Sequence, residues 1–72
     1  MDKYELTENE NVVMNFTLYQ IRALKDLGEI KAGTLGGWIT GEHNLSQEGD
    51  AWLYGNAKVY GEAQVLESEK RE

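Results

Sequence analysis

The chain has no cysteine and no proline, and the first absence removes two common ways of stabilising a small protein. Without cysteine there can be neither a disulfide nor a cysteine-based metal site. A chain of 72 residues buries only ~60% of the surface that its unfolded form exposes. Below about 70–80 residues a lone hydrophobic core rarely supplies more than about 3–5 kcal/mol. We therefore expect one small domain, stabilised by very regular backbone pairing or by a second copy of the chain.

Basic residues are also scarce, with 7 Lys and Arg against 13 Asp and Glu and a net charge of −6. An excess of acid repels phosphate and anionic lipid, which disfavours direct binding of nucleic acid or of a membrane. An acidic surface can still occupy a basic groove on another protein. Residues 1–5 lack the basic and apolar regions of a signal peptide. No apolar run approaches the ~18 residues of a membrane span, so we expect a soluble, cytoplasmic protein.

Three consecutive six-residue repeats occupy residues 49–66. They read Gly-Asp-Ala-Trp-Leu-Tyr, Gly-Asn-Ala-Lys-Val-Tyr and Gly-Glu-Ala-Gln-Val-Leu. Each repeat alternates like a short strand, and its Gly with the polar residue that follows supplies a turn. Repetition of a short strand and a tight turn coils the chain into a parallel β-helix, with neighbouring coils about 4.8 Å apart. The expected interior residues are Leu53, Val59 and Val65.

The same rhythm continues upstream, where Ile39 and Leu45 are six residues apart. The spacing from Leu45 to Leu53 is eight, so we expect a loop or bulge around Gln47–Glu48. The predicted fold is all-β, with a β lead-in over residues 1–38, one to two β-helix coils over 39–66, and a charged tail over 67–72 that frays.

The lead-in is expected to consist of paired strands. Residues 7–11 are predicted to form a turn, and residues 12–24 a strand with a bulge near Leu18–Tyr19. A helix over residues 18–27 is the alternative, because its apolar residues also fit a helical stripe. A turn over 25–28 and a short strand over 29–32 follow. The glycines of residues 33–38 are expected to allow close backbone packing where the lead-in joins the coils.

The stretches Thr17–Leu24, Lys31–Ile39 and Asn44–Ser46, together with the repeats, resemble small bacterial and phage or prophage-encoded proteins. In these proteins a β lead-in precedes hexapeptide-type repeats. The resemblance implies a left-handed, triangular β-helix with three repeats in each coil, and it implies little about activity. The few repeats here leave an open coil edge near Val65, which a polar tail or a second chain would cover. We expect a homodimer.

Catalysis and metal binding find little support in the sequence. Acyltransferases of the wider hexapeptide-repeat group look similar in their coils and rely on a histidine, and His43 is the single histidine here. A general base needs an orienting partner and a cleft, and the adjacent Glu42 is expected to point away. We therefore expect His43 to be an exposed turn residue and the protein not to be an enzyme. Glu42, Glu48 and Asp50, together with His43, could hold a hard cation weakly, but we expect solvated turn acids, with no metal and no cofactor.

The expected binding residues are four aromatic side chains in or beside the coils and a stretch of acids. Tyr54 and Tyr60 are predicted to stack on one outer ridge, and Trp52 to lie above Lys58 and Gln64 on another. Stacked aromatics either stabilise the ladder or anchor a partner. No Lys or Arg lies between Lys31 and Lys58, so the stretch would attract a basic surface or serve only as a solvated face. The full predicted set is Trp38, Glu42, Glu48, Asp50, Trp52, Tyr54 and Tyr60.

The function expected from these features is that of a non-enzymatic, phage-type binding protein that inhibits a host protein. Anti-defence activity is the specific hypothesis, with the acidic stretch occupying a basic site such as that of a nucleic-acid-binding immune effector. The phage origin rests on the resemblance alone. Three alternatives stay open: a structural module whose coils stack end to end, a sponge for a nucleotide-like signal, and a degenerate acyltransferase.

Overall fold

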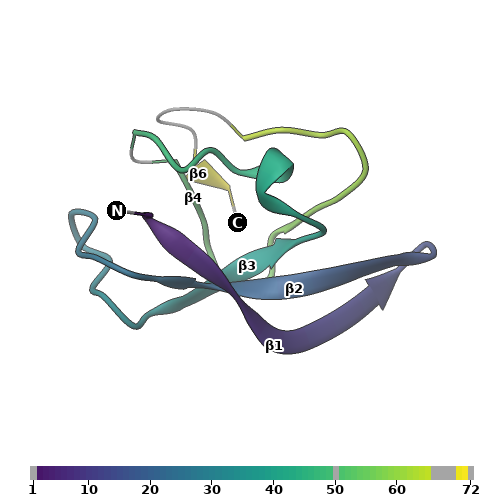
Figure 1. The fold of residues 1–72 in the computed structure, drawn as a ribbon, viewed down its shortest axis with the longest axis horizontal. Coiled ribbons are helices and arrows are strands. Elements are labelled where there is room, and N and C mark those ends of the chain that lie inside the picture. Colours follow the sequence, from purple (N-terminus) through teal and green to yellow (C-terminus); the bar gives the residue numbers. More distant parts are fainter. Residues whose placement is uncertain (1, 50, 66–69, 72) are drawn as a thin grey trace.

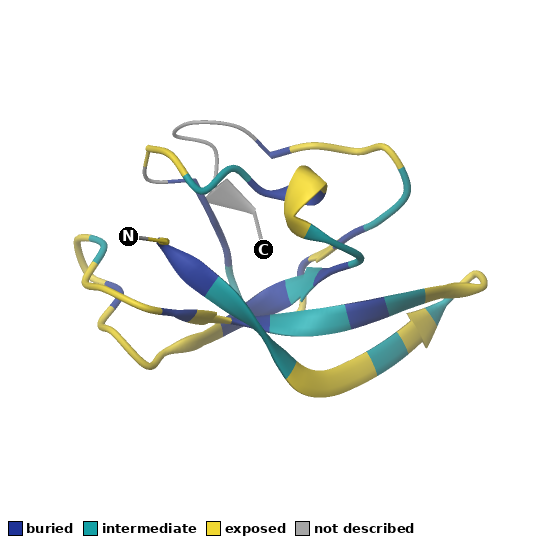
Figure 2. Ribbon diagram, viewed as in Figure 1, coloured by how far each residue is buried: buried dark blue, intermediate teal, exposed yellow. Residues whose placement is uncertain are grey.

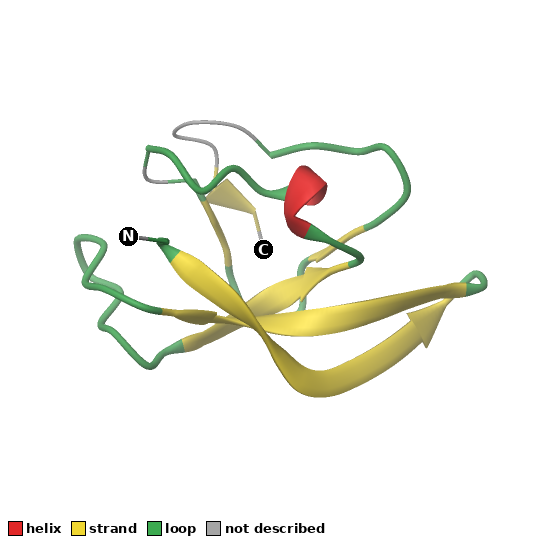
Figure 3. Ribbon diagram, viewed as in Figure 1, coloured by secondary structure: helices red, strands yellow, loops and turns green. Residues whose placement is uncertain are grey.

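The computed structural model describes residues 2–49, 51–65 and 70–71, and its strands form two sheets (Figure 1). The larger sheet has the order β1-β2-β3-β5, with β1 at Tyr4–Val13, β2 at Phe16–Ala23, β3 at Leu35–Ile39 and β5 at Lys58–Val59. The smaller sheet pairs β4 at Trp52–Leu53 with β6 at Lys70–Arg71. The helical element in the part of the chain that the structure describes is a 3-10 turn, η1, at Glu42–Asn44 (Figure 3). The all-β prediction is confirmed.

The lead-in is a long antiparallel hairpin of β1 and β2. Its two turn residues, Met14 and Asn15, have φ angles of 50° and 72°, as expected for a two-residue hairpin turn in which both central residues are left-handed. The predicted turn over residues 7–11 is therefore wrong, because those residues lie inside β1. The register shifts between Leu6 and Glu10, which marks a bulge there. Polar side chains fill this stretch because β1 is an edge strand with solvent on its outer side, and such a strand looks like a loop in sequence.

Strand β2 decides between the two predictions for residues 18–27. Residues 16–23 are extended, so the helical alternative is excluded. The predicted change of buried face does occur, since Leu18 and Ile21 are both buried although they are three residues apart. The register between β2 and β3 shifts between Gln20 and Arg22, slightly beyond the predicted position.

Three parallel contacts define the β-helix. Trp38 pairs with Lys58 and Leu45 pairs with Val65, each 20 residues apart, whereas Trp52 pairs with Lys70, 18 residues apart. Three parallel sides in one turn of the chain confirm the short β-helix. Eighteen is the length of three hexads, so the first coil contains two extra residues. They lie between Leu45 and Trp52, where the spacing of eight predicted a loop.

The second coil extends beyond the repeats that are visible in the sequence. Lys70–Arg71, expected to fray in a charged tail, form β6 beside Trp52–Leu53. The six-residue spacing continues from Val65 to Arg71. Parallel pairing uses backbone groups and does not require an aliphatic residue in each repeat, so the coil continues past the last repeat that is visible in the sequence. The rest of the predicted tail, residues 67–69 and 72, lies outside the described residues.

The coil geometry also corrects the predicted aromatic ridges. One hexad forms one side of the triangle, so residues six apart lie on neighbouring sides and stacking requires the full coil length. Tyr54 and Tyr60 therefore do not lie above one another. Trp52 lies beside Lys70, and Lys58 lies beside Trp38.

The core lies between the sheet and the coils (Figure 2). Leu53, Val59 and Val65 are all buried, as the repeat predicted. The glycine-rich link also behaves as expected. A Cβ atom on Gly36 would lie 2.6 Å from the carbonyl oxygen of Leu53, and one on Gly37 would lie 2.6 Å from that of Ala57. Only glycine therefore lets β3 approach the coil backbone this closely.

Candidate functional site

Tyr4, at the start of β1, joins the lead-in to the first coil. Its hydroxyl donates a hydrogen bond of 2.5 Å to the carbonyl oxygen of Leu45, across 41 residues of sequence. Burial raises the pKa of this phenol well above its usual value, and the negative charges of Glu42 and Asp2 raise it further. The hydroxyl is therefore a neutral donor at physiological pH.

Lys3 and Gln47 complete this joint. The Lys3 ammonium is buried and donates to the carbonyl oxygen of Ala51 at 2.7 Å. Gln47 lies in the two-residue expansion of the first coil. Its Oε1 accepts from the backbone N–H of Lys3 at 2.8 Å and of Tyr4 at 3.2 Å, and its Nε2 donates to the carbonyl oxygen of Tyr4 at 3.2 Å. The extra residues of the first coil therefore bind the lead-in.

Asn44, the last residue of η1, joins the first coil to the second. Its Oδ1 accepts from the backbone N–H groups of Thr40 and Gly41 and from the Thr40 hydroxyl. Its Nδ2 donates to the carbonyl oxygens of Gly61 at 3.2 Å and Ala63 at 2.8 Å. This side chain is fully buried, and both ends of its amide are hydrogen-bonded.

His43 lies beside this joint and is exposed, as predicted. Its Nε2 lies 2.8 Å from the carbonyl oxygen of Gly61. A carbonyl oxygen only accepts, so Nε2 carries the hydrogen, and in the neutral ring Nδ1 carries the lone pair. The sequence showed no side chain that could orient the His43 ring. In the structure a backbone carbonyl group of the next coil, that of Gly61, orients it.

The four predicted aromatic residues do not gather on one surface. Trp52, expected on an outer ridge, is 1% exposed and belongs to the core. Strand β3 covers its ring at Gly36, so closely that a Cβ atom on Gly36 would lie 2.7 Å from the ring. Trp38 is half-buried in β3, and Tyr54 is half-buried against the core. Tyr60 is half-buried against the hairpin, with its ring centroid 5.4 Å from that of Phe16.

The predicted acids are only partly placed together. Glu42 and Glu48 are both exposed, and Glu42 accepts a weak hydrogen bond from Gln47 Nε2 at 3.4 Å. Asp50 lies outside the described residues. Within the described ranges, no three acidic or histidine side chains lie close enough to hold a metal ion.

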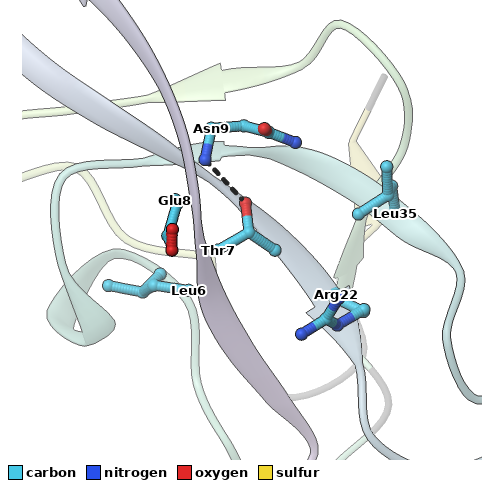
Figure 4. Close-up of a pocket in the computed structure, with 6 residues that line it drawn as sticks. All are labelled: Leu6, Thr7, Glu8, Asn9, Arg22 and Leu35. Atoms are coloured by element: carbon cyan, nitrogen blue, oxygen red, sulfur yellow. Dashed lines mark hydrogen bonds between the residues drawn. The ribbon is translucent and has the colours of Figure 1, made fainter.

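A cavity of about 400 Å³ lies on the lead-in, where sequence reasoning placed no site (Figure 4). It forms at the bulge of β1 between Leu6 and Glu10. In the sequence, this place is marked by the polar residues that interrupt the alternation of the strand. Two of the polar side chains around it are already engaged: the Thr7 hydroxyl donates to the Gln20 carbonyl at 2.8 Å, and Arg22 pairs with Glu5. The lining residues are Leu6, Thr7, Glu8, Asn9, Arg22 and Leu35.

Comparison with known proteins identifies one informative relative. No family model matches the chain. An uncharacterized acetyltransferase of Escherichia coli strain K12, YdcK, is 39% identical over 74 aligned positions, which include 90% of this chain and 23% of the relative. The similarity supports the hexapeptide-repeat family. The chain spans less than a quarter of the length of that relative.

This relative overturns one expectation from the sequence. We expected the protein to lie outside the enzymes, because one histidine without a cleft gave no catalytic set. The named relative is an acetyltransferase, which points to membership of an enzyme family, so that expectation is wrong.

The described residues contain no helix that is long and apolar enough to cross a membrane.

Proposed function

We propose that this chain starts a β-helix of the acetyltransferase type. In this role the lead-in covers one end of the coils, and the second coil offers its open edge to further coils. The observation that carries the proposal is the position of β3, which is antiparallel to β2 on one side and parallel to β5 on the other. One strand thereby converts a hairpin into a coil.

Two further observations support this role. The lead-in is bound to the first coil through Tyr4, Lys3 and Gln47, so one end of the coils is covered by hydrogen-bonded structure. Strand β5 is the last strand in the larger sheet, and its outer edge has no strand partner among the described residues. An exposed edge of this kind is a template for another strand.

The test is to append one further coil, built from three Gly-Asn-Ala-Lys-Val-Tyr hexads, and to measure amide hydrogen exchange. The matched control carries the same residues in shuffled order. We expect the ordered coil to become protected from exchange and to raise the melting temperature, since repeat proteins gain stability from each neighbouring interface. Added hexads that exchange as fast as the shuffled sequence would refute the proposal.

A second candidate function is acetyl transfer with His43 as the general base. It is favoured by the bond from His43 Nε2 to the Gly61 carbonyl, which leaves Nδ1 as the proton acceptor and fixes the ring. Coenzyme A release from acetyl-coenzyme A, measured with a set of amine and hydroxyl acceptors, tests it. The expected result is activity that falls at least about a hundredfold in His43→Ala. Activity that His43→Ala leaves unchanged would exclude this base.

Inhibition of a host protein by a phage-encoded homodimer stays a prediction. Glu42 and Glu48 are exposed, as it requires, whereas Trp52 is buried and cannot be one of its anchors. A pull-down with the wild type and a Glu42→Lys, Glu48→Lys variant, together with the light-scattering mass, tests it. Equal retention of the same proteins by both forms would argue against the acidic face.

A further inference from the structure

We propose that the free edge of β1 binds a basic, extended peptide segment of a partner protein as an added antiparallel strand. This site is separate from the coil edge at β5, and it does not depend on the role proposed above. Strand β1 is the first strand in the order β1-β2-β3-β5. Its outer side therefore lacks a strand partner in the part of the chain that the structure describes. Figure 1 shows the end of this hairpin reaching beyond the coils.

The hairpin turn determines which backbone groups point outward. Val13 and Phe16 flank the two-residue turn, and such a closing pair exchanges both of its hydrogen bonds. Because bonded and non-bonded pairs then alternate, the N–H and C=O groups of Val12 and Glu10 face the free edge. The bulge between Leu6 and Glu10 ends this regular run. The site is therefore a short ladder over residues 10–13.

Apolar side chains accompany this ladder. Val12 is 68% exposed, and Met14 in the turn is 74% exposed. Large apolar side chains on an exposed edge strand are a typical feature of a surface that pairs with another chain. Phe16, which pairs with Val13, lies on the other face of the hairpin, with its ring centroid 5.4 Å from that of Tyr60, and does not belong to this patch.

The charges beside the ladder favour a basic occupant. Glu8 and Glu10 are exposed, and neither forms an ion pair with a described residue, whereas Glu5 is paired with Arg22. A second copy of the chain would bring more glutamates to the same edge and would add to a net charge of −6, which is unfavourable. Lysine or arginine opposite Glu10 gains a cross-strand ion pair instead.

The pairing predicts a pattern for the peptide. In an antiparallel ladder the residue opposite Val12 precedes the residue opposite Glu10 by two positions. The preferred segment is therefore an apolar residue, any residue, and a basic residue, in that order. Alternation places both specific side chains on one face of the new strand.

The probe is a peptide in which every second residue is threonine and the residues between the threonines are two valines followed by two lysines. It is titrated into the isotope-labelled chain, and its binding is followed by the amide chemical shifts of the chain. We expect shifts confined to Glu8–Phe16 and the neighbouring residues of β2. Shifts centred on Lys58–Val59, or no shifts at peptide concentrations in the millimolar range, would overturn the proposal.

Two matched controls separate strand addition from simple charge attraction. The first is the same peptide with N-methyl groups on the residues opposite Val12 and Glu10, which removes backbone donors and keeps the side chains. The second compares Glu10→Lys with Glu29→Lys. Glu29 is exposed and lies far from Glu10 in the sequence, and its substitution changes the net charge by the same amount as Glu10→Lys. We expect about tenfold weaker binding for the methylated peptide and for Glu10→Lys, and little change for Glu29→Lys. Equal binding of both peptides, or equal loss in both variants, would overturn the proposal.

Discussion

The side-chain amide of Gln47 pairs with the backbone of Tyr4 as a neighbouring strand would. Its Oε1 accepts from the Tyr4 N–H at 3.2 Å, and its Nε2 donates to the Tyr4 carbonyl oxygen at 3.2 Å. The two residues are separated by 43 positions. A side chain in the expanded loop of the first coil thereby supplies hydrogen-bond partners for the backbone N–H and C=O groups of the first residue of β1. The irregularity in the repeat and the attachment of the lead-in are thus one structural feature.

The first prediction concerns this pairing. Replacing Gln47 by Leu leaves the backbone N–H groups of Lys3 and Tyr4 without their acceptor, and we expect the free energy of unfolding to fall by about 2 kcal/mol. The control is Gln64→Leu, the same change at an exposed position. Urea unfolding of both variants gives the comparison. Equal stability of the two would show that Gln47 does not secure the lead-in.

The second prediction concerns the Tyr4 hydroxyl. Tyr4→Phe removes the donor to the Leu45 carbonyl oxygen and should cost about 1–2 kcal/mol at neutral pH. Above pH 10 the wild type should also lose stability. Burial raises the pKa of the Tyr4 hydroxyl in the folded chain above its usual value of about 10, so the unfolded phenol ionises first and favours unfolding by up to about 1.4 kcal/mol per pH unit.

The pH dependence is measured as a difference between the two proteins. Wild-type and Tyr4→Phe stabilities, determined by urea unfolding from pH 7 to pH 12, should converge as the pH rises above 10. The subtraction removes the titration of lysines that both proteins share. A constant difference across this range would mean that the Tyr4 hydroxyl ionises equally easily in the folded and unfolded chains.

The periodic part of the fold could be predicted from the sequence, and the joint could not. Ile39, Leu45 and Leu53 reveal the coil because interior positions of a β-helix recur at a fixed spacing, including the spacing of eight that marks the expansion. Lys3 and Gln47 have no period, and their contact spans 44 residues. A contact of that kind leaves no local pattern to read.

The lead-in and the aromatic residues show two further limits. Residues 7–11 looked like a turn because an edge strand carries polar side chains, and only the pairing with β2 reveals it. Trp52 occupies a hexad position that is expected to face outward. It is buried because β3 packs against it at Gly36, and the repeat contains no information about what covers a coil.

The third prediction concerns Asn44, whose amide joins the two coils. Asn44→Asp removes the donors to the carbonyl oxygens of Gly61 and Ala63 and places a negative charge beside them. Because the side chain is buried, we expect a loss of about 3 kcal/mol in unfolding free energy. Asn56→Asp makes the same charge change at an exposed position and should be nearly neutral. Similar losses in the two variants would point to net charge as the cause.

The fourth prediction concerns the close approach of β3 to the coil at Gly36. An added methyl group would lie 2.6 Å from the Leu53 carbonyl oxygen and 2.7 Å from the Trp52 ring, and neither can move without displacing the first coil. We expect Gly36→Ala to lose about 3 kcal/mol in urea unfolding. Gly41→Ala is the matched control, because its nearest neighbour is the exposed His43 ring at 3.1 Å, which needs to shift by only a few tenths of an ångström. If Gly36→Ala and Gly41→Ala both unfolded at the same urea concentration as the wild type, an added methyl group would fit between β3 and the coil, and the close approach would not limit this position.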